Sequence, residues 1–204
     1  ESLPSMHWQG NLFGRATHNL VLRRELARAY EEIDRELQVV GDIQRSLLPS
    51  ELPAIATLEL AAHYRTSQRA GGDYYDLFPL GDNRWGLFIA DVSGHGTPAA
   101  VMMAVTHAIA HSHPHVPEPP EAVLARLNRT LHNGYTRGNG TFVTAFYGVL
   151  DTTDGSILYV NAGHNPPLLY QRAGHTLTPL PEHGIALGIM SGADAAEKLH
   201  AGAT

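Results

Sequence analysis

The hydrophobic period of the chain changes at two prolines, Pro49 and Pro53. Before them, apolar side chains recur at alternating spacings of four and three residues, which is the stripe of a coiled-coil-like helix. The residues of this stripe are Leu26, Tyr30, Ile33, Leu37, Val40 and Leu47, with Gln44 as an interruption. Because proline ends a helix, the sequence predicts a helix over residues 20–48 and a different architecture after it.

The apolar stripe has two interpretations. It packs on its own domain, or it pairs with a second copy of the chain in a homodimer, because about three heptads can serve either purpose. We expect three parts: an N-terminal segment over 1–19, a linker or dimerisation helix over 20–48, and a folded domain over 49–204.

Aromatic, β-branched and aliphatic residues dominate six short segments after the prolines, which predicts strands. These segments are 58–64, 74–80, 85–90, 142–150, 157–161 and 168–171. Short turns at Gly81-Asp82-Asn83 and Asp154-Gly155 indicate antiparallel hairpins. Helices are expected over 98–111, which is apolar almost all round, and over 121–131. The sequence therefore predicts an α+β fold in which helices cover antiparallel sheets.

Composition excludes several classes of function. The chain has 14 Lys plus Arg against 20 Asp plus Glu and no basic run, which argues against nucleic acid as a partner. With no cysteine, thiolate metal sites and cysteine nucleophiles are excluded, so any metal is held by oxygen or imidazole. The longest apolar run, 99–105, falls short of the ~20 residues that cross a bilayer. We expect no membrane insertion and a cytoplasmic location.

Two aspartates stand out in segments rich in Gly, Asp and His. Asp73 follows two glycines and opens a predicted strand, and Asp91 ends the next one. An isolated Gly-Gly-Asp is usually a turn with an Asx hydrogen bond. If the two strands pair through the 81–83 turn, however, both carboxylates lie at one end of the hairpin. Such a pair forms an oxygen-rich site suited to magnesium or manganese.

Five motifs, in order, carry a family resemblance: QRSLLPSELP, AGGDYYD, IADVSGHGTPAA, GTFVTAFYGVLD and YVNAGHNPPLL. Over residues 41–190 the chain resembles the SpoIIE-type branch of the PPM metal-dependent serine/threonine protein phosphatases. The resemblance implies two stacked antiparallel sheets flanked by helices, with two Mn2+ or Mg2+ ions at one edge. It implies that Asp73 ligates one ion, that Asp91 bridges both, and that the Val92 carbonyl completes part of one shell. The implied substrate is a phosphorylated bacterial regulatory protein, commonly an anti-anti-sigma factor in stress or sporulation signalling.

This chemistry suits a chain without cysteine, because two metal ions activate a water and neutralise the phosphoryl oxygens without a covalent intermediate. His95 is a candidate to protonate the leaving group, although the family pattern does not fix the general acid. His164 and Asn165 either shape the sheet edge near the site or serve a structural role. Gly72 and Gly94 are expected to shape the loops that hold the two aspartates.

Four histidines, His107, His111, His113 and His115, cluster at the end of the first predicted helix of the domain and in the loop after it. The pair His107 and His111, four residues apart, could hold a transition metal on one helix face. No acidic third ligand lies nearby in the sequence, so we expect these histidines to be exposed and to bind nickel or zinc only adventitiously.

The domain departs from the family pattern at its C-terminal end. Relatives carry, after an LGI segment, a strand and a Thr-Asp-Gly turn whose aspartate is a further metal ligand. Here the only such string, Thr153-Asp154-Gly155, precedes that position and is expected in a turn between strands. We therefore expect a phosphatase domain that lacks its C-terminal part. The alternative is a non-catalytic dimerising or signalling module that keeps the fold with an incomplete metal site.

Overall fold

The computed structural model of the chain describes residues 3–66, 69–112, 118–180, 184–191, 199 and 201–203. The chain divides into two compact units, Glu1–Val39 and Val40–Thr204. Helix α1 (Leu3–Ser46) makes up the first unit and contributes its last seven residues to the second. The helix expected over 20–48 therefore begins much earlier in the chain, and it ends shortly before Pro49.

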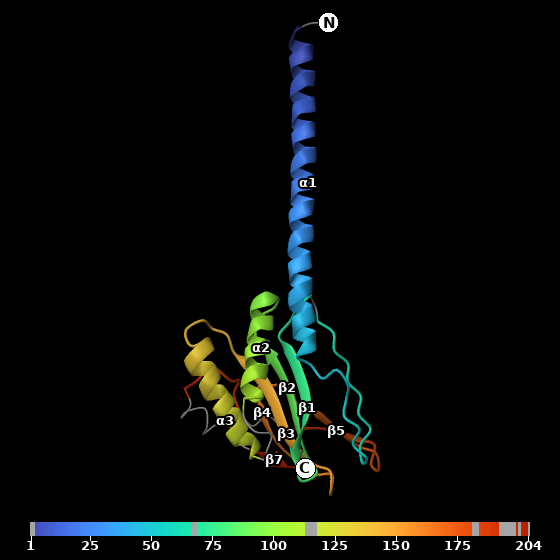
Figure 1. The fold of residues 1–204 in the computed structure, drawn as a ribbon, viewed down its shortest axis with the longest axis vertical. Helices are drawn as coiled ribbons and strands as arrows, with labels where there is room; N and C mark the ends of the chain where they lie inside the picture. Colours follow the sequence, from blue (N-terminus) through green and yellow to red (C-terminus); the bar gives the residue numbers. More distant parts are fainter. Residues whose placement is uncertain are drawn as a thin grey trace. The chain divides into compact units, whose positions relative to one another are not determined.

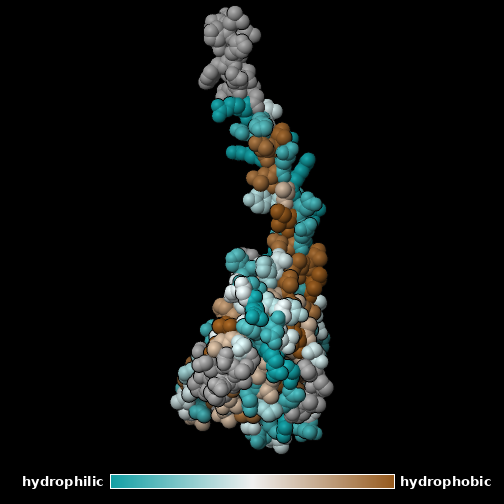
Figure 2. Space-filling view, turned by 90° about the vertical axis from the view of Figure 1, so that its left-hand side faces the viewer, coloured by the Kyte–Doolittle hydropathy of each residue, from teal (hydrophilic) through white to brown (hydrophobic). Residues whose placement is uncertain are grey.

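The first unit exposes a series of apolar side chains on α1, several of which are visible in Figure 2. They are Leu20, Val21, Leu22, Leu26, Tyr30, Ile33 and Val39. Tyr30 is 64% exposed and Ile33 is 54% exposed. Three residues of the predicted stripe, Leu26, Tyr30 and Ile33, are thus exposed. Leu37 and Val40 are half-buried, and Leu47 follows the helix and packs against the core of the second unit.

The second unit contains a five-stranded antiparallel sheet in the order β1-β2-β3-β4-β7. Its strands are β1 (Asp73–Gly81), β2 (Arg84–Val92), β3 (Val143–Asp151), β4 (Ile157–Ala162) and β7 (Gly202–Ala203). A separate antiparallel hairpin consists of β5 (Leu168–Gln171) and β6 (Thr176–Pro179). The β1–β2 turn has positive φ at Gly81, Asp82 and Asn83, which suits these turn-forming residues.

Two helices, α2 (Thr97–Ala110) and α3 (Pro120–Leu131), cover one face of the large sheet (Figure 1). A π-helical turn, η1 (His132–Thr136), follows α3. The core lies between these helices and the sheet, where Met103, Leu124 and Leu131 pack with Phe88 and Val143. The α+β class, with antiparallel sheets flanked by helices and an N-terminal helix, is therefore confirmed.

Three expectations about local structure were wrong. Residues 58–64 form no strand, because in the described part of the chain no other segment pairs with them. Strands β6 and β7 were not anticipated. Helix α2 is buried on one side only, with Val101 54% exposed. Its neighbours in the sheet are β1 and β2 at the sheet edge, so its outer side faces solvent.

None of the described helices has an apolar stretch long enough to span a bilayer.

Candidate metal and active site

Asp73 and Asp91 lie directly opposite each other at one end of the β1–β2 hairpin. The register of the antiparallel pair runs from this end to the turn at residues 81–83, so the hairpin geometry expected from the sequence is confirmed. Both side chains reach solvent, although the neighbouring chain around Asp91 partly shields its carboxylate. Opposed positions of an antiparallel pair hold their Cβ atoms ~5 Å apart, which places the two carboxylates within reach of a shared ion.

Gly72 and Val92 complete the hairpin end. The amide of Val92 donates a hydrogen bond to the Gly72 carbonyl at 3.2 Å. A Cβ on residue 72 would stand 2.6 Å from the Val92 carbonyl oxygen, so only glycine allows the two backbones to approach this closely. Just beyond, Gly94 has φ 96°, a conformation that favours glycine and turns the chain away from Asp91 toward α2.

The electrostatics of the pair favour a cation. Partial burial raises the pKa of Asp91, and the neighbouring carboxylate of Asp73 raises it further. Two carboxylates at this spacing repel each other when both are ionised, so bringing a divalent cation between them relieves the repulsion.

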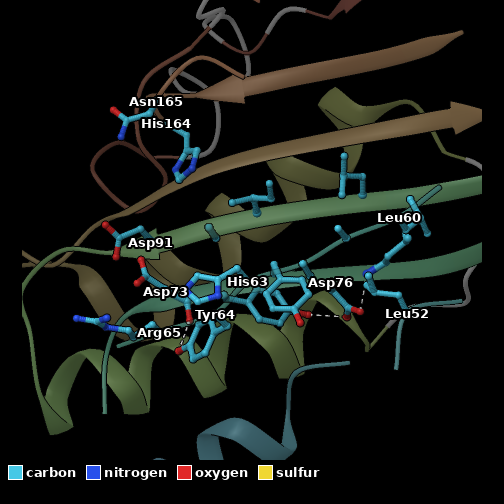
Figure 3. Close-up of a pocket in the computed structure, with 18 residues that line it drawn as sticks. Leu52, Leu60, His63, Tyr64, Arg65, Asp73, Asp76, Asp91, His164 and Asn165 are labelled. Atoms are coloured by element: carbon cyan, nitrogen blue, oxygen red, sulfur yellow. Dashed lines mark hydrogen bonds between the residues drawn. The ribbon is translucent and has the colours of Figure 1, made fainter. Parts of the chain in front are cut away.

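The acidic pair lines a pocket of about 790 Å³ (Figure 3). Other residues around it include His63, Tyr64 and Arg65 from the irregular segment before β1, and His164 after β4. Asp76 also lines it, so the pocket combines three carboxyl side chains with a guanidinium and with imidazoles, a polar set able to hold a phosphate ester beside metal ions.

Tyr64 supports the Asp73 end of this pocket from behind. Its hydroxyl donates a hydrogen bond to the Asp73 carbonyl at 3.1 Å and accepts one from the Gln44 amide at 3.2 Å. Burial, followed by the charge of Asp73, raises the pKa of Tyr64 to about 12, so the phenol remains a hydrogen-bond donor at neutral pH. Gln44 also donates to the Gly71 carbonyl and accepts from the Gly71 amide. The end of α1 thus fixes the backbone that leads into Asp73.

His164 is held on the opposite side of the acidic pair. Its Nδ1 and the Thr144 hydroxyl are 2.9 Å apart, and that hydroxyl also lies 3.4 Å from the Asp91 carbonyl. The Asn161 side chain accepts from the His164 amide and donates to its carbonyl, which closes the turn after β4. Burial lowers the pKa of His164, an effect that Asp73 opposes, so the ring is neutral at physiological pH.

The structure brings four of the sequence-predicted residues together in one pocket, while Gly72, Val92 and Gly94 lie in the backbone next to the acidic pair and are not among the pocket's lining residues in the described part of the chain. Asp73, Asp91, His164 and Asn165 line one pocket. His95 is exposed and is not among the described residues that line it. Its role as general acid stays a prediction. The Thr-Asp-Gly string lies in the β3–β4 turn as expected, and its exposed aspartate accepts a hydrogen bond from the Ser156 amide.

Four residues of the site were missed from the sequence: Gln44, Tyr64, Arg65 and Thr144. Tyr64 is the last residue of the segment 58–64 that was wrongly interpreted as a strand, and Arg65 follows it. Gln44 had a visible signal, because it interrupts an otherwise apolar stripe. Thr144 sits opposite Asp91 in the β2–β3 register, which only the pairing of the strands reveals.

Comparison with known proteins relates this architecture to phosphatases. Residues 81–201 match the family described as Stage II sporulation protein E (SpoIIE). The phosphoserine phosphatase RsbU of Bacillus subtilis (strain 168) is 30% identical over 159 residues, which cover 78% of this chain and 47% of the relative.

Solved structures share the fold. The SiaA-PP2C domain of Pseudomonas aeruginosa gives a TM-score of 0.69 at 19% identity and covers 86% of this chain and 68% of that domain. The structure of the RsbU and RsbW domains of Rv1364c from Mycobacterium tuberculosis gives a TM-score of 0.55 at 25% identity, over 68% of this chain and 37% of that one. The chain spans less than half the length of the curated relatives it matches.

Proposed function

The chain belongs to the SpoIIE family, and from this premise we propose that its second unit is a metal-dependent phosphatase acting on phosphoserine or phosphothreonine in a protein. The single observation that carries the proposal is the direct pairing of Asp73 with Asp91 in the lining of a pocket. The similarity to a phosphoserine phosphatase supports the same reaction class.

We propose that Asp73, Asp91 and the Val92 carbonyl hold Mn2+ or Mg2+, with two ions at the complete site. The donors are all oxygens, which these hard cations prefer. Gly72 lets the chain leading into Asp73 lie close against Val92, so the Val92 backbone stands beside the acidic pair. When bound, the ions supply Lewis acidity that polarises the phosphate ester and acidifies a water molecule.

The side chains of the pocket have complementary roles in this proposal. Arg65 supplies a guanidinium, which binds phosphate oxygens through paired N–H groups. Tyr64 holds the backbone of Asp73 in place through its hydrogen bond to that carbonyl. His164 is positioned through its Nδ1 by Thr144, and its neutral ring adds no charge to repel incoming cations.

We further propose that the substrate is a phosphorylated regulatory protein of the anti-anti-sigma-factor kind. The family membership supports this, as does the occurrence of RsbU and RsbW domains together in a related structure. The exposed apolar side chains of α1 support homodimerisation through 20–48. A cytoplasmic location stays a prediction.

The test is the release of inorganic phosphate from a phosphoseryl peptide by the full chain with Mn2+. Asp91→Asn should lower the rate by at least about 100-fold, because even residues that only support a metal ligand cost about 10–100-fold when changed. Asp82→Asn is the matched control: it makes the same substitution at the turn of the same hairpin, where φ is 49° and Asn is well tolerated. Chelation of the metal should abolish the activity of both the wild type and this control.

Two results would contradict the proposal. One is phosphate release that continues at the wild-type rate in Asp91→Asn or after chelation of the metal. This would place the reaction elsewhere in the chain. The other is a wild-type chain that binds the phosphoprotein but releases no phosphate with Mn2+ or Mg2+, which would establish the non-catalytic module instead.

A further inference from the structure

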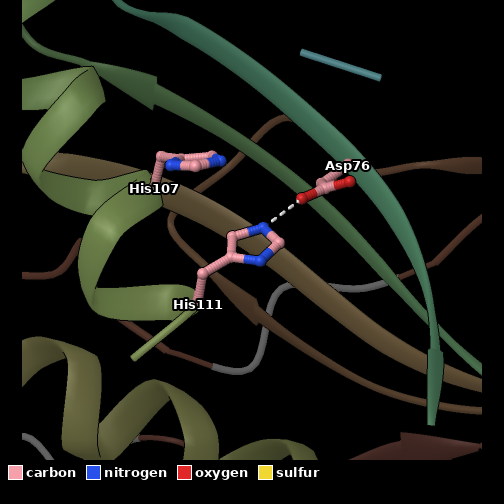
Figure 4. A group of neighbouring side chains, drawn as sticks. All are labelled: Asp76, His107 and His111. Atoms are coloured by element: carbon pink, nitrogen blue, oxygen red, sulfur yellow. Dashed lines mark hydrogen bonds and ion pairs between the residues drawn. The ribbon is translucent and has the colours of Figure 1, made fainter. Parts of the chain in front are cut away.

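A second group of metal-ligand residues lies where helix α2 packs on strand β1 (Figure 4). Asp76 comes from β1, His107 lies in the last turn of α2, and His111 is the residue that caps the C-terminus of α2. One potential ligand atom from each of the three residues lies within 4.8 Å of the other two. The expectation that these histidines are exposed and lack an acidic third ligand was wrong for His107 and His111, which are half-buried beside Asp76 because β1 packs against this end of α2. His113 and His115 lie outside the described residues.

The carboxylate of Asp76 is buried and held from several sides. Its Oδ2 accepts a hydrogen bond from the Tyr74 hydroxyl at 2.8 Å and lies 2.5 Å from His111 Nε2. Its Oδ1 accepts from the Leu77 amide at 2.8 Å. Asp76 is 7% exposed, so these contacts offset the cost of burying a charge. Tyr74 and Leu77 occupy the position of supporting partners that orient a metal-binding carboxylate.

The two imidazoles are also oriented in advance. The ring centroids of His107 and His111 are 4.4 Å apart, and the planes of the two rings make an angle of 30°. This proximity is expected for positions four residues apart on a helix. Tyr74 packs edge-on against His107 at 5.6 Å, and Phe78 packs against His111 at 5.6 Å. These aromatic contacts restrict both rings. Burial, followed by the proximity of His111, lowers the pKa of His107, so its ring is in the neutral form that binds metals.

We propose that Asp76, His107 and His111 bind a divalent transition-metal ion of the zinc class. Metal–ligand bonds of ~2.1 Å in tetrahedral geometry place ligand atoms ~3.4 Å apart. The contact between His111 and Asp76 therefore opens by about 1 Å as the ion enters, and a neutral His111 ring that binds through Nε2 carries its hydrogen on Nδ1 instead. Two imidazoles and one carboxylate leave the fourth position to water.

The donor set distinguishes this site from the acidic pair Asp73 and Asp91. Two imidazole nitrogens favour zinc and its neighbours over magnesium and manganese, which prefer all-oxygen sites. Both sites use strand β1, but their expected ion preferences differ. The zinc-class ion would join α2 to the edge strand of the sheet, so it should stabilise the native state by binding there and not to the unfolded chain.

The test is a zinc titration of the full chain against a chromophoric chelator, carried out in an Asp91→Asn background so that the acidic pair contributes little. We expect one zinc per chain and a zinc-dependent rise in the midpoint of thermal unfolding. Substitution of cobalt should give the visible absorption bands of a four- or five-coordinate nitrogen and oxygen site.

His107→Gln and His111→Gln should each weaken zinc binding by at least about 10-fold and remove both the unfolding shift and the cobalt bands. His175→Gln is the control, an exposed histidine on the β5–β6 hairpin. His107→Gln leaves the hydrogen bonds of Asp76 with Tyr74, Leu77 and His111 in place, so it tests metal binding without disturbing the fold. Its midpoint of thermal unfolding without metal should therefore equal that of the parent chain.

Zinc affinity that is unchanged in both histidine variants, or a chain that binds no zinc, would overturn the proposal. Neither result bears on hydrolysis, because the assay measures ion binding in a background that lacks the Asp91 carboxylate.

Discussion

At the scale of single residues, Gln44 shows how a polar interruption in an apolar pattern carries information. It is 3% exposed. The side-chain amide makes hydrogen bonds with the backbone amide and carbonyl of Gly71 and with the Tyr64 hydroxyl. A leucine there would extend the stripe but leave the Gly71 amide and carbonyl without this partner. Gln44 therefore positions the chain leading into Asp73, which a periodicity argument alone does not reveal.

Asp91 carries a prediction about pH. Its raised pKa means that the metal-free native state holds a proton more tightly there than the unfolded chain does. Native stability from this group is present at low pH and is lost as the pH rises from about 4 through the raised pKa. Asp91→Asn removes that loss, so the variant should be more stable than the wild type near neutral pH.

Urea unfolding with a chelator, at about pH 4 and about pH 7.5, measures this effect. The midpoint advantage of Asp91→Asn should be larger at the higher pH. A variant with a lower midpoint than the wild type at the higher pH would contradict the account of repulsion between Asp73 and Asp91.

At the scale of elements, strands β1 to β5 and helices α2 and α3 lie close to their predicted ranges because their periodicity and turns are clear. The segment 58–64 has strand-like composition but no strand beside it in the described part of the chain. β6 is a short exposed strand whose alternation is too brief to detect, and β7 consists of two residues that pair with β4 only through the tertiary fold.

The close approach of α1 to the loop before β1 depends on Gly41. A Cβ at this position would lie 2.1 Å from the Arg69 carbonyl oxygen, so backbone would have to move. Although alanine favours a helix by ~1 kcal/mol over glycine, Gly41→Ala should destabilise the second unit by at least about 1 kcal/mol.

Chemical denaturation compares this variant with Gly134→Ala, a glycine in the π-helical turn with open space around its Cβ position. The control should leave the free energy of unfolding unchanged or raise it by up to about 1 kcal/mol, because alanine favours a helix and meets no atom here. Equal effects of the two substitutions would show that the Gly41 contact has no energetic consequence.

At the scale of the whole molecule, the exposed stripe of α1 predicts self-association. Ile33→Glu combined with Leu37→Glu places charges on the stripe and should shift the chain to monomer in sedimentation equilibrium. Glu32→Gln combined with Glu36→Gln, off the stripe, should leave association unchanged. A wild-type chain that is monomeric at high micromolar concentration would contradict the dimer.

The two candidate sites differ in how far the sequence could predict them. Asp73 and Asp91 were placed together because a short turn fixes the register of a hairpin. The approach of Asp76 to His107 and His111 depends on how α2 packs on β1, which local patterns do not specify. The pair Asp73 and Asp91 could therefore be predicted from local sequence, whereas the group of Asp76, His107 and His111 could not, because it depends on long-range packing.

The central claim is that the open end of the β1–β2 hairpin binds the divalent ions. Calorimetric titration of the full chain with Mn2+ tests it most directly, comparing Asp73→Asn, Asp91→Asn and the turn control Asp82→Asn. The account predicts wild-type binding in the control, weaker binding in Asp73→Asn, and the weakest binding in Asp91→Asn, because a bridging ligand serves both ions. Mn2+ affinity that is the same in all four proteins would contradict it.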